Sequence, residues 1–112
     1  MPSYLLQATY TPEAWANMLA NPQDRIEAVR PVVEKLGGKV TNGWFAFGEY
    51  DIVAIVEMPT NVDAAALSIA AAAAGAIRSL KTTPLLTSAE GIEAMKKAGM
   101  SGYRAPSRAT RA

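Results

Sequence analysis

The chain has 112 residues, a formal net charge of +1 and an apolar content of 50%, which together indicate one globular domain. The small net charge gives no strong field for nucleic acid or for an anionic membrane, so neither partner is expected. The lack of cysteine and histidine excludes disulfides, thiolate nucleophiles, histidine-dependent catalysis and the commonest zinc ligands, so we expect neither metal nor cofactor.

The first half of the chain opens with a strand and two helical segments. Residues 3–10 predict a strand, because the segment is short and carries two tyrosines. It stops at Thr11-Pro12, a pair suited to the N-cap and first turn of a helix. A second helical segment is predicted with Asn21 as its N-cap and Asp24 in its first turn. Its apolar face ends before a glycine pair and consists of Ile26, Val29, Val33 and Leu36.

Residues 39–47 and 50–58 predict a hairpin joined by the two-residue loop Gly48-Glu49. Glycine at the first central position is what a type II′ turn requires. This loop fixes the pairing of the strands and so divides their side chains between two faces. The face assigned to the helices contains Phe45, Phe47, Tyr50, Ile52, Ala54 and Val56. The other face contains Asn42, Trp44, Ala46, Asp51, Val53, Ile55 and Glu57.

The second half predicts an alanine-rich helix over residues 63–74, a fourth strand and a last helix. A thin stripe on the alanine-rich helix predicts close packing on a sheet and consists of Val62, Ala66, Ile69 and Ala73. Pro84 within the fourth strand indicates a sheet edge or the end of that strand. Thr87 and Glu90 are spaced as a capping box for the last helix, which ends near Ala98.

We assign residues 1–98 to the domain and residues 99–112 to a C-terminal tail rich in glycine and arginine. The tail has no apolar period, and we expect it to be solvated or to clamp a neighbouring subunit through Arg104, Arg108 and Arg111. The N-terminus lacks the basic segment and the apolar run of a secretory signal, so a cytoplasmic protein is expected.

The order strand, helix, strand, strand, helix, strand predicts an α+β, ferredoxin-like domain with one antiparallel sheet and both helices on one of its faces. The uncovered face, here called the open face, is apolar in its middle, where Trp44, Val53, Ile55 and Leu5 are expected to meet. We expect two copies to bury it in a homodimer. Polar residues at its margin are Gln7, Thr9, Asp51, Arg78 and Lys81.

The segment from Gly48 to Glu90 resembles the GYD domain family of small bacterial proteins. The shared pattern is a Gly-any-Tyr-Asp signature, an alanine-rich helix, a threonine-rich strand that begins Gly-any-hydrophobic-Arg, and an acidic residue that opens the last helix. Here it falls on Gly48, Tyr50, Asp51, Gly75, Arg78, Thr82, Thr83 and Glu90. The resemblance covers residues 3–98 and implies a dimeric α/β-barrel, but it implies no reaction.

Three functions follow from these residues. The first is a homo-oligomeric module that binds a small molecule or a protein at the open face, where Gln7, Thr9, Trp44, Asp51 and Arg78 are the candidate ligand contacts. The second is a cofactor-independent oxygenase or isomerase with Asp51 as its catalytic base. The third is a structural subunit of a larger assembly. Asp51 is also suited to a purely structural role, because a carboxylate beside a turn often accepts backbone hydrogen bonds.

Overall fold

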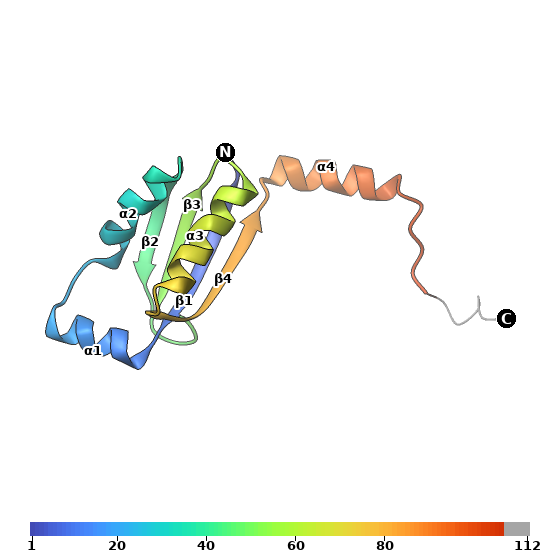
Figure 1. Cartoon of the computed structure of the whole chain (residues 1–112). Coiled ribbons are helices and arrows are strands. Elements are labelled where there is room, and N and C mark those ends of the chain that lie inside the picture. The colour runs from blue at the N-terminus through green and yellow to red at the C-terminus, as the bar shows by residue number, and fades with distance from the viewer. Residues whose placement is uncertain (107–112) are drawn as a thin grey trace.

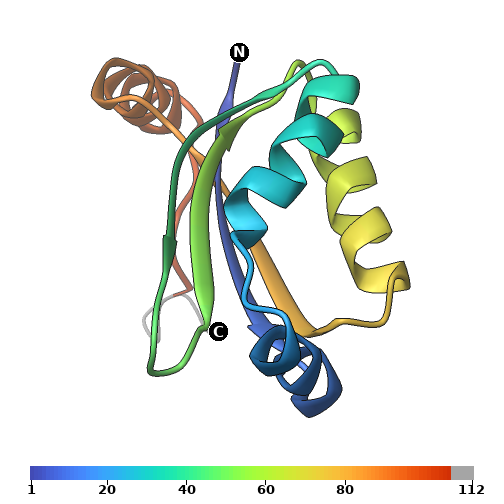
Figure 2. The ribbon, with the colours of Figure 1, turned by 90° about the vertical axis from the view of Figure 1, so that its left-hand side faces the viewer.

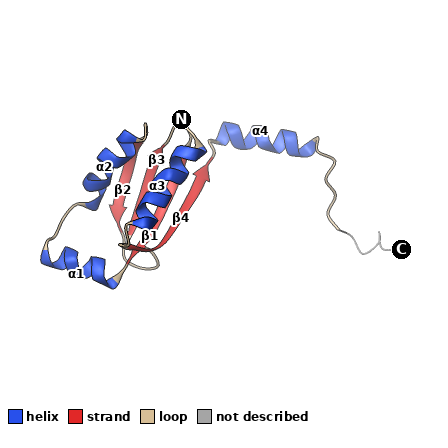
Figure 3. Ribbon diagram, viewed as in Figure 1, coloured by secondary structure: helices blue, strands red, loops and turns tan. Residues whose placement is uncertain are grey.

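The computed structural model describes residues 1–106, in which four strands and four helices follow one another along the chain (Figures 1 and 3). Arg108 and Arg111, two of the predicted tail contacts, lie outside the described residues. The elements are β1 Ser3–Tyr10, α1 Pro12–Ala20, α2 Arg25–Lys35, β2 Lys39–Phe45, β3 Ile52–Glu57, α3 Asn61–Ala73, β4 Ile77–Leu85 and α4 Ser88–Gly99.

The strands form one antiparallel sheet in the order β2-β3-β1-β4. Figure 2 shows α2 and α3 side by side over one face of this sheet, while α1 lies beyond the end of β1. The other face carries neither α2 nor α3. The predicted α+β, ferredoxin-like arrangement is therefore confirmed, and β4, the strand that contains Pro84, lies at an edge as predicted.

Local signals explain most helix ends. Thr11 caps α1 by accepting a hydrogen bond from the Ala14 amide, and Thr87 and Glu90 form the predicted capping box of α4. The predicted N-cap of α2 was wrong. The helix begins at Arg25, because the Asp24 carboxylate accepts hydrogen bonds from the amides of Ile26 and Glu27. Asp24 therefore satisfies two of the first amides of the helix, which have no partner within it.

The β2–β3 hairpin keeps the predicted register but not the predicted loop. Phe45 pairs with Ile52 and Trp44 with Val53, as expected. The strands end there, however, and residues 46–51 connect them. The amide of Ala46 still bonds to the carbonyl of Asp51, and the four residues inside this bond replace the predicted two-residue turn. The Phe47 side chain is fully exposed and Phe45 is about half exposed. Neither belongs to the core, although the sequence assigned both to the face that the helices cover.

The core lies between the sheet and the two covering helices. Its fully buried side chains are Tyr4, Val33, Val56 and Met58, and the Tyr4 hydroxyl donates a hydrogen bond to Asn61 at the start of α3. The predicted packing face of α2 is confirmed. That of α3 was wrong, because Ala64 and Leu67 are buried whereas Val62 and Ile69 are exposed.

Both edge strands contain one residue that has no partner across the ladder. In β2 this residue is Thr41, which falls between the pairs made by Val40 and Asn42 with β3. In β4 it is Arg78, which falls between Ile77 and Ser79 where these pair with β1. Such bulges twist a strand locally and disrupt its outer row of hydrogen-bonding groups.

Helix α4 projects away from the sheet and from both covering helices (Figure 1). None of its residues is buried, and the chain has a radius of gyration of 18.7 Å, compared with about 13 Å for a compact domain of this length. Its apolar side chains Ile92 and Met95 are exposed and lie one turn apart, with Lys96 next to Ile92 on the same side of the helix. The capping box stabilises the start of α4 locally. The helix is therefore defined by its own residues and not by packing on the rest of the domain. Within residues 1–106, no helix is long and apolar enough to cross a membrane.

Candidate functional site

The open face has the apolar centre that the sequence predicts. Across the two middle strands, Leu5 pairs with Ile55 and Gln7 pairs with Val53. Trp44 on β2 extends this surface, and 53% of its side chain is exposed. On β4, Lys81 and Thr83 stand opposite Gln7 and Leu5 and add polar groups at the margin. The open face is thus an uncovered apolar strip with a polar border.

Asp51 connects the hairpin loop to the end of β1. Its Oδ2 atom accepts one hydrogen bond from the Tyr10 amide at 2.9 Å and a second from the Trp15 indole at 3.2 Å. Its own amide donates to the carbonyl of Ala8 at 2.9 Å. The Trp15 and Tyr10 rings meet edge to face, 5.5 Å apart. These contacts explain Asp51 as the residue that holds the loop, β1 and α1 together.

The five predicted ligand contacts do not converge on one cavity. Trp44 lies on β2 and Arg78 on β4, at opposite edges of the sheet and roughly 14 Å apart across three strand spacings. Thr9 is buried, and its hydroxyl donates to the carbonyl of Glu49 at 3.3 Å. Gln7 is half-buried in the middle of the open face, whereas Arg78 is exposed at the bulge. Their role in ligand binding stays a prediction.

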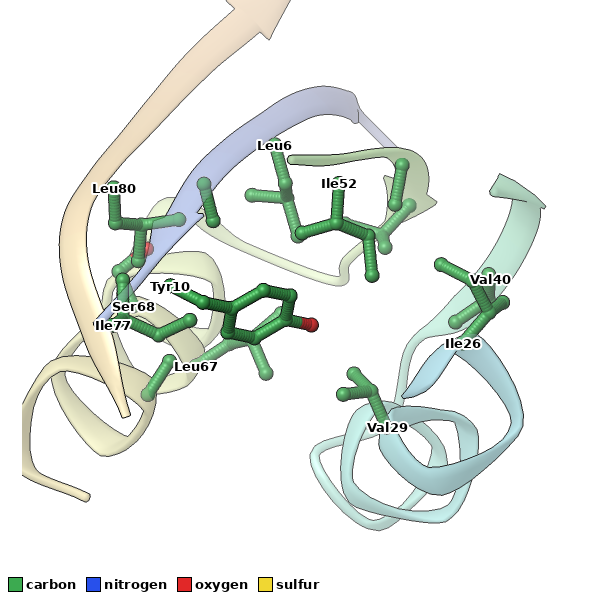
Figure 4. A pocket seen from close by; sticks show the side chains of 14 residues that line it. Leu6, Tyr10, Ile26, Val29, Val40, Ile52, Leu67, Ser68, Ile77 and Leu80 are labelled. Atoms are coloured by element: carbon green, nitrogen blue, oxygen red, sulfur yellow. The ribbon is translucent and has the colours of Figure 1, made fainter. Parts of the chain in front are cut away.

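A cavity lies on the other side of the sheet, beneath the space between α2 and α3. It has a volume of about 100 Å³ and an almost wholly apolar wall. Figure 4 shows the Tyr10 ring crossing it, with the hydroxyl directed toward the side of the cavity that Val29 of α2 occupies. The lining residues include Leu6, Ala8, Tyr10, Val29, Ile52, Ala54, Leu67, Ser68, Ala71 and Ile77.

Sequence reasoning missed this cavity because it placed the helix-facing residues in a closed core. The sequence did contain one indication of the cavity, which is that three of its lining residues are alanines. Ala8, Ala54 and Ala71 come from β1, β3 and α3 and all line the cavity. Alanine at facing positions leaves a volume that a larger side chain would fill.

Comparison with known families identifies the chain. A family model described as GYD domain matches residues 4–95, which include the hairpin loop, the alanine-rich helix and the start of α4. The chain belongs to the GYD domain family. No curated protein and no solved structure matches it significantly. Membership in this family assigns no substrate, partner or reaction to the protein.

The structure gives the signature residues of this GYD domain distinct roles. Gly48 has φ of +147°, a backbone conformation that glycine adopts most easily, and no other group crowds its position. Asp51 makes the hydrogen bonds described above. Tyr50, which precedes Asp51 in the signature, is half-buried. The signature therefore specifies how the loop turns and where it is attached.

The polar groups of the cavity in this GYD domain are few. Burial raises the pKa of the Tyr10 phenol, and the Arg25 guanidinium at the start of α2 acts in the opposite direction. The Ser68 hydroxyl donates to the Ala64 carbonyl at 3.1 Å and lies 2.8 Å from the Thr82 hydroxyl. Ser68 is therefore already paired, which leaves the Tyr10 hydroxyl as the polar group that Figure 4 shows inside the cavity.

Substituting Asp51 tests its structural role. Asp51→Ala removes the acceptor of the Tyr10 amide and of the Trp15 indole, so the free energy of unfolding should fall by about 1–3 kcal/mol. Asp51→Asn keeps one side-chain oxygen and should lose less. Urea titration followed by far-UV circular dichroism measures both values. If Asp51→Ala were as stable as the wild type, Asp51 would not be the anchor that we describe.

Proposed function

We propose that this GYD domain is a homo-oligomeric binding module and that its open face is the surface through which copies associate. The observation that carries the proposal is the strip formed by Leu5, Trp44, Val53 and Ile55, which neither α2 nor α3 covers. A contiguous apolar patch of this kind favours burial against another surface. Two open faces packed together would bury both strips and close a dimeric α/β-barrel.

Helix α4 supports the same assignment. Leu86, next to its first turn, is exposed, and so are Ile92 and Met95 along one side of the helix. A groove at its base is lined in part by Met1, Ile55 and Leu86, so the start of α4 adjoins the open face near Ile55. A second copy on the open face would extend the buried surface along this groove.

The remaining role of the open face is to hold a small molecule or a protein, with Gln7 in its middle and Lys81 at its margin as the nearest polar side chains. The enzymatic alternative requires Asp51 to accept a proton from a substrate. Both hydrogen bonds to its Oδ2 atom would compete with that step, and this favours the binding module. A structural subunit would use the same open face with a different chain.

The direct test is the mass of the full-length protein in solution. Light scattering over a range of micromolar concentrations should give an even-numbered oligomer, and native mass spectrometry should give the same stoichiometry. Denaturation of the same sample would release any non-covalently bound molecule for identification. A monomer at every concentration would contradict the proposal, because the apolar strip would then be stable in water without a second copy.

A further inference from the structure

A groove about 580 Å³ in volume lies between α3 and the edge strand β4. It is on the covered face of the sheet, because the core residue Tyr4 forms part of its floor. Its α3 wall extends from Asn61 to Ala72, which is about 17 Å of helix. Ile69, on the same wall, is 68% exposed. The α3–β4 groove is therefore as long as a helix of about three turns and carries an exposed apolar side chain.

The polar side chains of the α3–β4 groove already have partners within the chain. The Tyr4 hydroxyl donates a hydrogen bond to Asn61, and the Ser68 hydroxyl lies 2.8 Å from that of Thr82. Among residues 1–106, no buried side-chain nitrogen or oxygen lacks a hydrogen-bond partner. A polar small molecule would find no free buried group here, so the groove is suited to an apolar surface.

Helix α4 matches the groove in length and in its apolar side chains. Its 12 residues, Ser88–Gly99, span about 18 Å. It projects away from the sheet (Figure 1), and none of its residues is buried. Ile92 and Met95 lie one turn apart on it and are 53% and 72% exposed. Packing these two side chains against Ile69 would remove apolar surface of both helices from water.

The α3–β4 groove has one negative and one positive end. Tyr4 pairs with Pro84 and bonds to Asn61, so α3 begins where β4 ends. Asp63, the single charged residue of α3, is at this end. Arg78, near the start of β4, is exposed at the other end. Neither of these two charged residues takes part in an ion pair within residues 1–106.

The charges of α4 complement this groove in one direction. The two glutamates of α4 lie in its first half and the two lysines in its second half, and residues 96–112 contain five basic and no acidic side chains. An α4 antiparallel to α3 would therefore bring its acidic half to Arg78 and its basic half to Asp63. Lys96, unlike Lys97, has no ion pair within the part of the chain that the structure describes, so its ammonium group is free to approach Asp63.

The same charges disfavour docking of α4 in the groove of its own chain. Helix α4 follows the end of β4, so it begins beside the start of α3. Folded back into its own groove, it would run parallel to α3, with its glutamates beside Asp63 and its lysines near Arg78. Like charges would then meet at both ends. The α4 of a second copy can enter antiparallel and pair opposite charges at both ends.

We propose that α4 of one copy docks antiparallel to α3 in the α3–β4 groove of a second copy. Ile92 and Met95 pack against Ile69 of the other chain, and Lys96 lies beside Asp63. Reciprocal docking about a two-fold axis closes this exchange of helices after two copies. The contact goes beyond the proposed function, because it uses the face of the sheet opposite the open face. Dissociation of Ile55→Lys tests the open face, whereas a cross-link in the groove tests this contact.

Disulfide cross-linking is a direct test, because the chain contains no cysteine. The full-length double variant Ile69→Cys/Ile92→Cys, oxidised under mild conditions, should form covalent dimers on nonreducing electrophoresis. Val62→Cys/Ile92→Cys is the matched control, because Val62 is 76% exposed on the same helix but does not line the groove. The control should give about tenfold less dimer, since a disulfide needs Cα atoms within about 7 Å of each other.

Each result of this experiment decides for or against the contact. A disulfide formed within monomers would place α4 in its own groove and overturn the proposal. So would a yield of dimer no higher than that of the Val62→Cys/Ile92→Cys control. Dimers formed equally well by Ile92→Cys alone would show that two α4 helices contact each other instead of the groove.

A charge exchange tests the direction of docking. In the Ile69→Cys/Ile92→Cys background, Lys96→Glu should slow cross-linking roughly fivefold at low salt, and the addition of Asp63→Lys should restore the rate. Lys35→Glu, the same charge change on α2, should have no effect. If Lys96→Glu has no effect, or if Asp63→Lys is folded by circular dichroism but does not restore the rate, the antiparallel contact is wrong. Lys96 is exposed, so Lys96→Glu alone decides if Asp63→Lys does not fold.

Discussion

The Ile55→Lys variant should be a monomer at concentrations where the wild-type protein is an oligomer. Ile55 lies in the middle of the open face, beside Leu5. A lysine there would bring an unpaired charge into the proposed interface, where desolvation costs several kcal/mol, so the dissociation constant should rise roughly 100-fold or more. Sedimentation velocity over a concentration series measures this change directly.

Val32→Lys is the matched control for this experiment. Val32 lies on α2 and is 44% exposed, so the same substitution adds the same charge away from the open face. It should leave both the oligomer and the fold unchanged. Circular dichroism should show that Ile55→Lys is folded. Persistence of the wild-type oligomer in Ile55→Lys would exclude the open face as the interface, and dissociation of Val32→Lys would point to charge alone.

Tyr4→Ala should cause the largest loss of stability that the structure predicts for a single residue. The Tyr4 side chain is 2% exposed and packs in the core cluster with Val33, Val56 and Met58. Removal of a buried aromatic ring costs about 3–5 kcal/mol of unfolding free energy, which is a large fraction of the stability of a small domain. Guanidinium denaturation should show a much lower midpoint, or no folded state.

Two further variants serve as controls for Tyr4→Ala. One removes only the hydroxyl of Tyr4, and the other removes an exposed tyrosine ring elsewhere in the chain. Tyr4→Phe keeps the ring but loses the hydrogen bond to Asn61, so it should cost only about 1 kcal/mol. Tyr103→Ala changes an exposed tyrosine and should alter stability by less than about 0.5 kcal/mol. The central role of Tyr4 would be refuted if Tyr4→Ala and Tyr103→Ala had similar midpoints.

The sequence predicted well those features that depend on neighbouring residues. The bounds of β1 and the caps at Thr11 and Thr87 were right, because each rests on a short pattern of residues and on backbone groups nearby. The start of α2 was wrong because both Asn21 and Asp24 are good N-caps. The choice between them depends on the amides that the carboxylate of Asp24 meets in the folded chain.

Features that depend on distant contacts were harder to predict. The hairpin register was right, but the loop is longer because Asp51 donates its amide to Ala8 of β1 and because Thr9 bonds to Glu49. Both contacts join residues that are far apart in the sequence, so no pattern of neighbouring residues predicts them. The cavity was also missed, since it requires alanines from three elements to face one another and α2 and α3 to stand apart above them. Alternation assigns a residue to a face of the sheet but does not give the distance between that face and a helix.

The irregular edge strands limit how copies of this chain can join. Strand-by-strand addition needs a continuous row of free amides and carbonyls, and the bulges at Thr41 and Arg78 interrupt that row on each side of the sheet. Pro84 removes one more amide from β4. Growth by edge pairing, which has no natural end and leads to fibres, is therefore disfavoured. The proposed contact between open faces has no such continuation, because it is complete once two copies have met.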